Sequence, residues 1–129
     1  MEEEPSRSLN ALSRDVIGAA IEVHEELGPG LVESAYASCL TEVLRDEGHE
    51  VSREVCIPAR FRGRELDAYY RLDLTVDERL VLEIKAVEEL HAVHKSQLLT
   101  YLEMAEAPLG LLINFNVPKI VDGLERVVC

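Results

Sequence analysis

The stretch Arg71–Lys85, RLDLTVDERLVLEIK, has the pattern of two short strands joined by a tight turn. Alternate side chains of a strand point to opposite faces, so Glu83 and Lys85 share one face of the second strand. Leu82 and Ile84 occupy its other face. The stretch therefore predicts two charged side chains on one side of an otherwise apolar strand.

The first strand brings a third charged side chain to the same place. If residues 77–79 form a three-residue loop, Asp73 lies directly opposite Glu83. Opposed residues have Cβ atoms about 4.5–5.5 Å apart. Two carboxylates at that separation repel each other and lose solvation unless something compensates them. A divalent cation would do so, and a plain cross-strand ion cluster with Lys85 is the alternative.

The rest of the chain indicates a sheet with helices packed against it. Apolar residues at three- and four-residue spacing predict helices over about residues 10–27, 31–47 and 88–105. Alternating or continuous apolar runs predict strands over residues 51–61, 68–76, 80–86 and 109–116, with a final edge strand at 124–128. This order predicts an α/β (α+β) fold with a mixed sheet of four to five strands flanked by helices.

Length and composition indicate a single globular domain. The chain has 129 residues, of which 47% are hydrophobic and 29% are charged. We expect residues 1–9 to be a flexible acidic tail and residues 10–129 to form the domain. The acidic amino terminus and the lack of a long apolar run predict no secretory leader and no membrane contact, which favours a soluble, cytoplasmic protein. The three cysteines have no paired short spacing, so neither a disulfide framework nor a cysteine zinc site is indicated.

The charge is negative overall but unevenly spread. The formal net charge of −12 disfavours a nucleic-acid partner, because phosphates favour basic surfaces. Residues 51–71, however, hold five arginines against three acidic residues, a net charge of +2 that leaves −14 for the remainder. This local basic ribbon could contact a phosphate backbone, or it could simply be solvated. The candidate contacts are Arg60, Arg62, Arg64 and Arg71.

The order Asp73…Glu83-Ile84-Lys85 resembles the signature of the PD-(D/E)XK nuclease superfamily. The restriction-endonuclease-like core of that superfamily implies the order ααβββαβ, which agrees with the elements expected above. Residues 30–36, GLVESAY, also reproduce the pattern that names the GxxExxY family, which is generally placed in this superfamily. The resemblance extends over residues 17–128. One departure is that Leu72 stands where the superfamily name has proline.

Two further motifs resemble the RecB-like and lambda-exonuclease-like branches. Those branches add a glutamate from the preceding helix and a Gln-x-x-x-Tyr motif on the following helix, matched here by Glu33 and by Gln97 with Tyr101. The resemblance implies that Glu33 lies near a metal and that the other two residues line the site. Gln97 and Tyr101 are four residues apart, so they share a helix face, and His94 lies on the same side as a candidate substrate contact.

The activity implied by the resemblance is a Mg²⁺- or Mn²⁺-dependent nuclease that hydrolyses phosphodiester bonds in nucleic acid, DNA ahead of RNA. Asp73, Glu83 and Glu33 would hold or assist the metal, and Lys85 would stabilise developing negative charge. A homodimer could supply additional surface for the substrate. The alternative is a nuclease fold used as a weakly active or non-catalytic module for binding and assembly, which the overall acidity and small size favour.

Two further residue types have structural alternatives. Tyr36, three residues after Glu33, could flank the cleft or pack in the core, and packing is the favoured interpretation. His91 and His94 are three residues apart on the expected helix. No third histidine or cysteine accompanies them at a spacing typical of zinc sites, so zinc is not expected.

Overall fold

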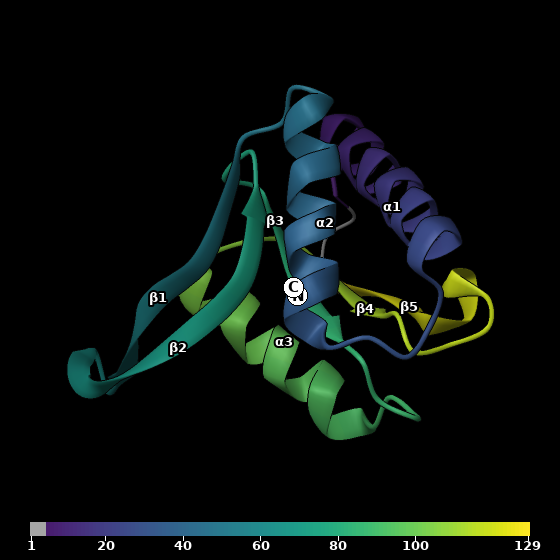
Figure 1. Cartoon of the computed structure of the whole chain (residues 1–129). Helices are drawn as coiled ribbons and strands as arrows, with labels where there is room; N and C mark the ends of the chain where they lie inside the picture. The colour runs from purple at the N-terminus through teal and green to yellow at the C-terminus, as the bar shows by residue number, and fades with distance from the viewer. Residues whose placement is uncertain (1–4) are drawn as a thin grey trace.

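The computed structural model describes residues 5–129, and its elements follow the expected order (Figure 1). Two helices come first, three strands follow, and a third helix precedes the last two strands. The elements are α1 (Arg7–Leu27), α2 (Glu33–Asp46), β1 (Val51–Phe61), β2 (Arg64–Val76), β3 (Leu80–Lys85), α3 (Ala92–Ala105), β4 (Leu109–Asn114), the short 3₁₀ helix η1 (Ile120–Gly123) and β5 (Leu124–Val128).

The five strands form one mixed sheet in the order β1-β2-β3-β4-β5. Strand β3 pairs with β4 in parallel, whereas the other three neighbouring pairs are antiparallel. Parallel neighbours need a long crossover connection, and α3 provides it between β3 and β4. This mixed sheet flanked by helices is consistent with the restriction-endonuclease-like fold expected from the sequence.

The sheet separates two apolar clusters. On one face, α1 and α2 pack side by side over buried residues of β2, β3 and β4, including Leu74, Leu82 and Leu111 (Figure 1). On the other face, Leu98 and Leu102 of α3 pack with buried residues of the same strands and β5. Strands β3 and β4 are therefore covered on both faces, which explains why residues 109–114 read as a continuous apolar run.

The expected tail boundary at residue 9 is wrong, because α1 begins at Arg7. Ser6 caps the helix, since its hydroxyl accepts a hydrogen bond from the Leu9 N–H at 3.1 Å. Leu9 is itself buried and extends the apolar stripe of the helix by one turn. Only residues 1–4 of the expected tail lie outside the described residues.

Helix α2 begins at Glu33, two residues later than expected, and Leu31 before it is 41% exposed. The Tyr36 hydroxyl donates to the Gly28 carbonyl at 2.5 Å and accepts from the Leu31 N–H at 3.1 Å. The Tyr36 ring is fully buried and stacks on Phe115 with ring centroids 4.5 Å apart. The prediction that Tyr36 packs in the core is confirmed, and its hydroxyl ties down the loop that leads into α2.

Strands β1 and β2 form a long hairpin that reaches away from the other three strands (Figure 1). Strand β2 begins at Arg64, four residues earlier than expected, because it stays paired with β1 as far as the tip of the hairpin. Helix α3 instead begins later, at Ala92. Across residues 5–129, the helices are too short or too polar for any of them to cross a membrane.

Candidate active site

Asp73 and Glu83 face each other where β2 and β3 separate. The ladder between these strands comprises Leu74–Leu82 and the two pairs beyond it toward the turn, as the three-residue loop at 77–79 predicts. Past the Leu74–Leu82 pair, side chains bridge the strands instead. The Ile84 N–H donates to Asp73 Oδ2 at 2.8 Å, and the Asp73 N–H donates to Glu83 Oε1 at 3.2 Å. The two carboxylates therefore occupy the opening between the strands.

A backbone irregularity on β1 accompanies this opening. Glu54 has φ 51°, in the left-handed region, and lies between the pairs Arg53–Leu74 and Val55–Leu72. At the same level, the face of the sheet on which β2 buries its apolar side chains changes. Leu74 packs beneath α1 and α2, whereas Leu72 packs against α3, although both positions would share a face in a regular strand. The outer part of the β1–β2 hairpin, residues 55–72, is called the arm below. The arm thus turns away from the sheet at the level of Asp73.

Glu33 joins the site as the first residue of α2. Its Oε2 accepts a hydrogen bond from the Ala86 N–H at 3.1 Å, directly after Lys85. A carboxylate at this position is also favoured by the helix dipole. Glu33 and Asp73 line the same hollow of about 190 Å³, whose other lining residues are Ser34, Ala37, Arg53, Glu54, Arg71 and Ile84.

Asn114 holds the chain that follows Lys85, and sequence reasoning missed it. Asn114 is only 2% exposed. Its Nδ2 donates to the Val87 carbonyl at 2.9 Å, while its Oδ1 accepts from the Val87 and Asn116 N–H groups. The Phe115 N–H also donates to the Lys85 carbonyl at 2.9 Å. The available signal in the sequence was Asn114 itself, a polar amide inside the apolar run of residues 109–116.

The electrostatics of the carboxylate pair are unfavourable without a cation. Glu83 is 5% exposed, and burial raises its pKa well above the ordinary range. The charge of Asp73 raises the pKa of Glu83 further, and the charge of Lys85 offsets only part of this. The charge of Lys85 therefore compensates the carboxylate pair only in part, which is less than the ion-cluster alternative requires.

Tyr101 of α3 lies within electrostatic reach of both carboxylates. Burial raises the pKa of the Tyr101 phenol, and the negative charges of Glu83 and Asp73 raise it further. The Tyr101 ring also contacts Tyr70 of β2, with ring centroids 5.5 Å apart. Tyr101 is therefore near enough to Asp73 and Glu83 for their charges to act on its phenol, and Tyr70 is a neighbour that sequence reasoning did not identify.

Gln97 and His94 occupy other surroundings. Gln97 is exposed, one turn before Tyr101 on α3. The His94 ring accepts the His91 N–H at 3.0 Å and so helps to cap α3. His94 also lines a separate hollow with Val87, Glu88, Glu89 and His91. The substrate roles of Gln97 and His94 stay predictions.

A family model described as the PD-(D/E)XK nuclease superfamily matches residues 10–127. The chain belongs to that superfamily. A search of curated proteins and a search of solved structures found no match to the chain. PD-(D/E)XK nucleases generally use divalent metals, which raises the question of whether this site suits one.

The donor set of this PD-(D/E)XK domain fits a magnesium-type ion that a substrate helps to bind. Within residues 5–129, no group of three or more His, Cys, Asp or Glu side chains is arranged to hold a metal ion alone. Asp73 and Glu83 nevertheless each accept a backbone hydrogen bond through one carboxylate oxygen. The second oxygen of each carboxylate is left as a possible metal ligand. Magnesium is typically bound by one or two carboxylates together with substrate phosphates.

The arginines of this PD-(D/E)XK domain divide between the site and the tip of the arm. Arg71 lines the hollow with Asp73 and lies 3.9 Å from a Glu54 oxygen. Arg60, Arg62 and Arg64 surround the β1–β2 turn, where Arg60 lies 3.7 Å from Glu65. All four side chains are exposed, so these contacts add little stability.

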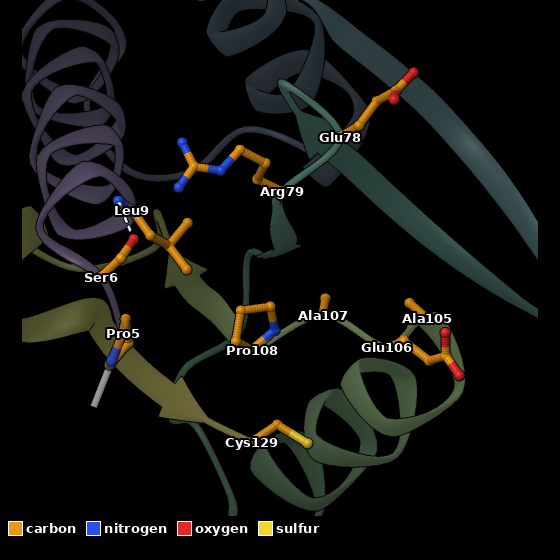
Figure 2. Close-up of a pocket in the computed structure, with 10 residues that line it drawn as sticks. All are labelled: Pro5, Ser6, Leu9, Glu78, Arg79, Ala105, Glu106, Ala107, Pro108 and Cys129. Carbon is orange, nitrogen blue, oxygen red and sulfur yellow. Dashed lines mark hydrogen bonds between the residues drawn. The ribbon is translucent and has the colours of Figure 1, made fainter. Parts of the chain in front are cut away.

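A larger hollow, of about 640 Å³, lies away from the carboxylates of this PD-(D/E)XK domain (Figure 2). It lies between the start of α1, the β2–β3 turn and the segment after α3. Figure 2 shows the Arg79 side chain on one side of this hollow and Cys129 on another. Among the described residues that line this hollow, no two carboxylates face each other as Asp73 and Glu83 do. We therefore place the candidate active site at the smaller hollow beside Asp73.

Proposed function

We propose that this protein is a metal-dependent nuclease that hydrolyses phosphodiester bonds in nucleic acid, with DNA as its substrate. One observation carries the proposal. Asp73 and Glu83 oppose each other across the opening between β2 and β3, in a chain of the PD-(D/E)XK nuclease superfamily. The raised pKa of Glu83 supports it, because a bound cation would relieve the repulsion that Lys85 only partly offsets.

Each residue has a distinct role in this proposal. Asp73 and Glu83 would hold Mg²⁺ or Mn²⁺, and Glu33 on the shared hollow would assist through a direct or water-mediated contact. The ion would supply an activated water and neutralise charge on the phosphate oxygens. Lys85 follows Glu83 on the same strand face and would stabilise negative charge that develops during hydrolysis.

Helix α3 would position the substrate from the other side. We assign Tyr101 to the site because its phenol lies within electrostatic reach of both carboxylates. Gln97 and His94 extend the same helix face and would contact the strand being cut. Residues 30–36 favour the GxxExxY family, and Glu33 together with this Gln-x-x-x-Tyr helix favours the RecB-like or lambda-exonuclease-like branch. A homodimer would add surface for a long substrate.

A second candidate function is a non-catalytic or weakly active nuclease-fold module that binds nucleic acid or protein. Two observations favour it. The net charge of −12 repels phosphate from most of the surface, and among residues 5–129 no three-ligand group is arranged to hold a metal ion alone. This candidate predicts that the carboxylate pair does not bind metal at millimolar concentration.

Cleavage assays test the nuclease proposal directly. Labelled single-stranded and duplex DNA would be incubated with Mg²⁺ or Mn²⁺ and with wild type, Asp73→Asn, Lys85→Met or Glu103→Gln. We expect the first two variants to lose about 100-fold or more in rate, because each removes charge at the reacting phosphate. Glu103→Gln should match wild type, since Glu103 is an exposed residue of α3. Equal rates for wild type and both site variants would contradict the mechanism.

Calorimetric titration separates the two candidate functions. Under the nuclease proposal, wild type binds Mn²⁺ and Asp73→Asn binds it much more weakly. Wild type that binds no metal and cleaves no DNA would instead favour the module. Circular dichroism of each variant confirms that a lost signal is not a lost fold.

A further inference from the structure

One face of the β1–β2 arm leads from the candidate site to open solvent. Leu72 and Tyr70 of β2 point toward α3, where Leu72 packs in the α3 cluster and Tyr70 contacts Tyr101. Alternation therefore places Arg71 and Tyr69 on the opposite face. Arg71 lines the same hollow as Asp73, so this face begins at Asp73 and continues along the arm. Figure 1 shows that β1 and β2 reach away from the other strands.

Tyr69 is the unusual residue on this face. Its side chain is 67% exposed, although it is large and aromatic. Its cross-strand partner is Pro58, a rigid residue, at the level where the β1–β2 register shifts. The backbone of Tyr69 is therefore paired with β1 while its ring stays open to solvent. An open aromatic ring is suited to stacking on a nucleic-acid base.

The charge distribution favours the arm over the rest of the surface for a phosphate chain. Residues 51–71 carry a net charge of +2, against −14 for the rest of the chain. A nucleic-acid strand is consequently attracted to the arm and repelled by the remaining surface. Arg53 and Arg71 both line the hollow with Asp73. Arg53 donates a hydrogen bond to Ser38 Oγ at 3.1 Å, whereas the ion pair of Arg71 within the described residues is a 3.9 Å contact with exposed Glu54.

The spacing of the two side chains suits one strand. Residues two apart on a strand are separated by about 7 Å along it, so a single chain could place a phosphate on Arg71 and a base on Tyr69. In a duplex, the faces of internal bases are already stacked on one another. A side chain can stack only on a base that is unpaired or at an end.

We propose that an unpaired nucleic-acid strand lies along this face, with a phosphate on Arg71 beside the carboxylates and a base stacked on Tyr69 farther out. This inference rests on the proposed nuclease function and adds the class of substrate, single strands or frayed ends rather than intact duplex. The negative charge of the whole protein is then compatible with binding, because only the arm contacts the phosphates.

Binding measured without metal tests this inference separately from catalysis. Fluorescence anisotropy with a labelled oligonucleotide, single-stranded or annealed to its complement, would be recorded in EDTA. We expect wild type to bind the single strand more tightly, and Tyr69→Ala to weaken that binding about tenfold, the typical cost of losing one aromatic stacking contact. Tyr69→Phe keeps the ring and should retain the affinity. Val121→Ala, at an exposed apolar residue of η1, is the matched control and should leave it unchanged.

The inference is overturned if Tyr69→Ala binds the single strand as wild type does, if wild type prefers the duplex, or if wild type binds no single strand. Failure of the proposed function has a different signature. Single-strand binding that depends on Tyr69, without cleavage in Mg²⁺ or Mn²⁺, supports the stacking site and contradicts the nuclease. Cleavage that depends on Asp73, with binding indifferent to Tyr69, does the reverse.

Discussion

Strand β2 has two halves with opposite surroundings, divided at Asp73. From Leu74 to Val76 it pairs with both β1 and β3, and its apolar side chains are buried beneath α1 and α2. Within the described chain, the half from Arg64 to Arg71 pairs with β1 alone, and most of its side chains are exposed. Leu72 is the last buried side chain of β2 toward the tip, so its neighbour Asp73 lies at the edge of the packed part of the strand. The proposed nuclease would need fixed groups for catalysis and accessible ones for binding, and β2 carries both buried and exposed side chains.

The largest difference between the halves is expected in stability, because Leu74 is fully buried and Leu66 is 45% exposed. Leu74→Ala should lower the free energy of unfolding by about 2–5 kcal/mol through lost burial and a cavity. Leu66→Ala should change it by less than about 0.5 kcal/mol. Urea denaturation followed by circular dichroism measures both. Similar costs for the two variants would show that the arm is packed as firmly as the core.

A second matched pair compares two tyrosine hydroxyls. Tyr36→Phe removes the group that bridges the Gly28 carbonyl and the Leu31 N–H beside α2, and should cost about 1–2 kcal/mol. Tyr69→Phe removes an exposed hydroxyl on the arm and should cost almost nothing. Comparing the free energies of unfolding of the two variants tests this expected difference. If Tyr36→Phe were neutral, its hydroxyl would not hold the loop before Glu33.

The smallest expected effect lies at Asp77, directly after the packed half of β2. Its carboxylate accepts the Glu50 N–H at 2.8 Å and lies 2.8 Å from the His49 Nδ1 atom. Partial burial raises the pKa of Asp77, but the Glu50 N–H and the His49 imidazole together hold it below its ordinary value of 3.8. The carboxylate therefore stabilises the fold above pH 3.8, and this contribution disappears as the pH falls through the lower folded pKa.

Asp77→Asn should accordingly lose about 1 kcal/mol of stability at neutral pH. The difference from wild type should shrink below pH 3.8, where wild type loses the same contribution. Urea denaturation at a series of pH values measures it, with Asp122→Asn in η1 as an exposed control. A difference that stays constant into acid would contradict the assigned pKa shift.

Local patterns predicted the order of the elements and the β2–β3 register correctly. The three-residue loop at 77–79 sets the register, and with it the opposition of Asp73 and Glu83, because alternation along paired strands leaves little freedom. The burial of Tyr36 and the order of the elements also followed from apolar spacing. The start of α1 was misplaced because Ser6 and Leu9 were assigned to a polar tail, although serine is a strong N-cap residue and Leu9 continues the stripe.

Other features have no local signature. The left-handed φ of Glu54 and the exchange of faces between Leu72 and Leu74 arise where two strands separate. The hydrogen bonds between Asn114 and Val87 join residues far apart in the sequence. Each of these features depends on long-range packing that spacing does not encode.

The sequence by itself determined the order of helices and strands, the register between β2 and β3, and the opposition of Asp73 and Glu83. These features follow from periodicity along short stretches. Only the tertiary structure decided that Glu33 and Asp73 line one hollow, that Tyr101 lies within electrostatic reach of Asp73 and Glu83, and which part of β2 is buried. It also decided that Tyr69 is exposed on the arm. The physical reason is that helices and strands are set by neighbours in sequence, whereas a site is set by how separate elements pack across the sheet.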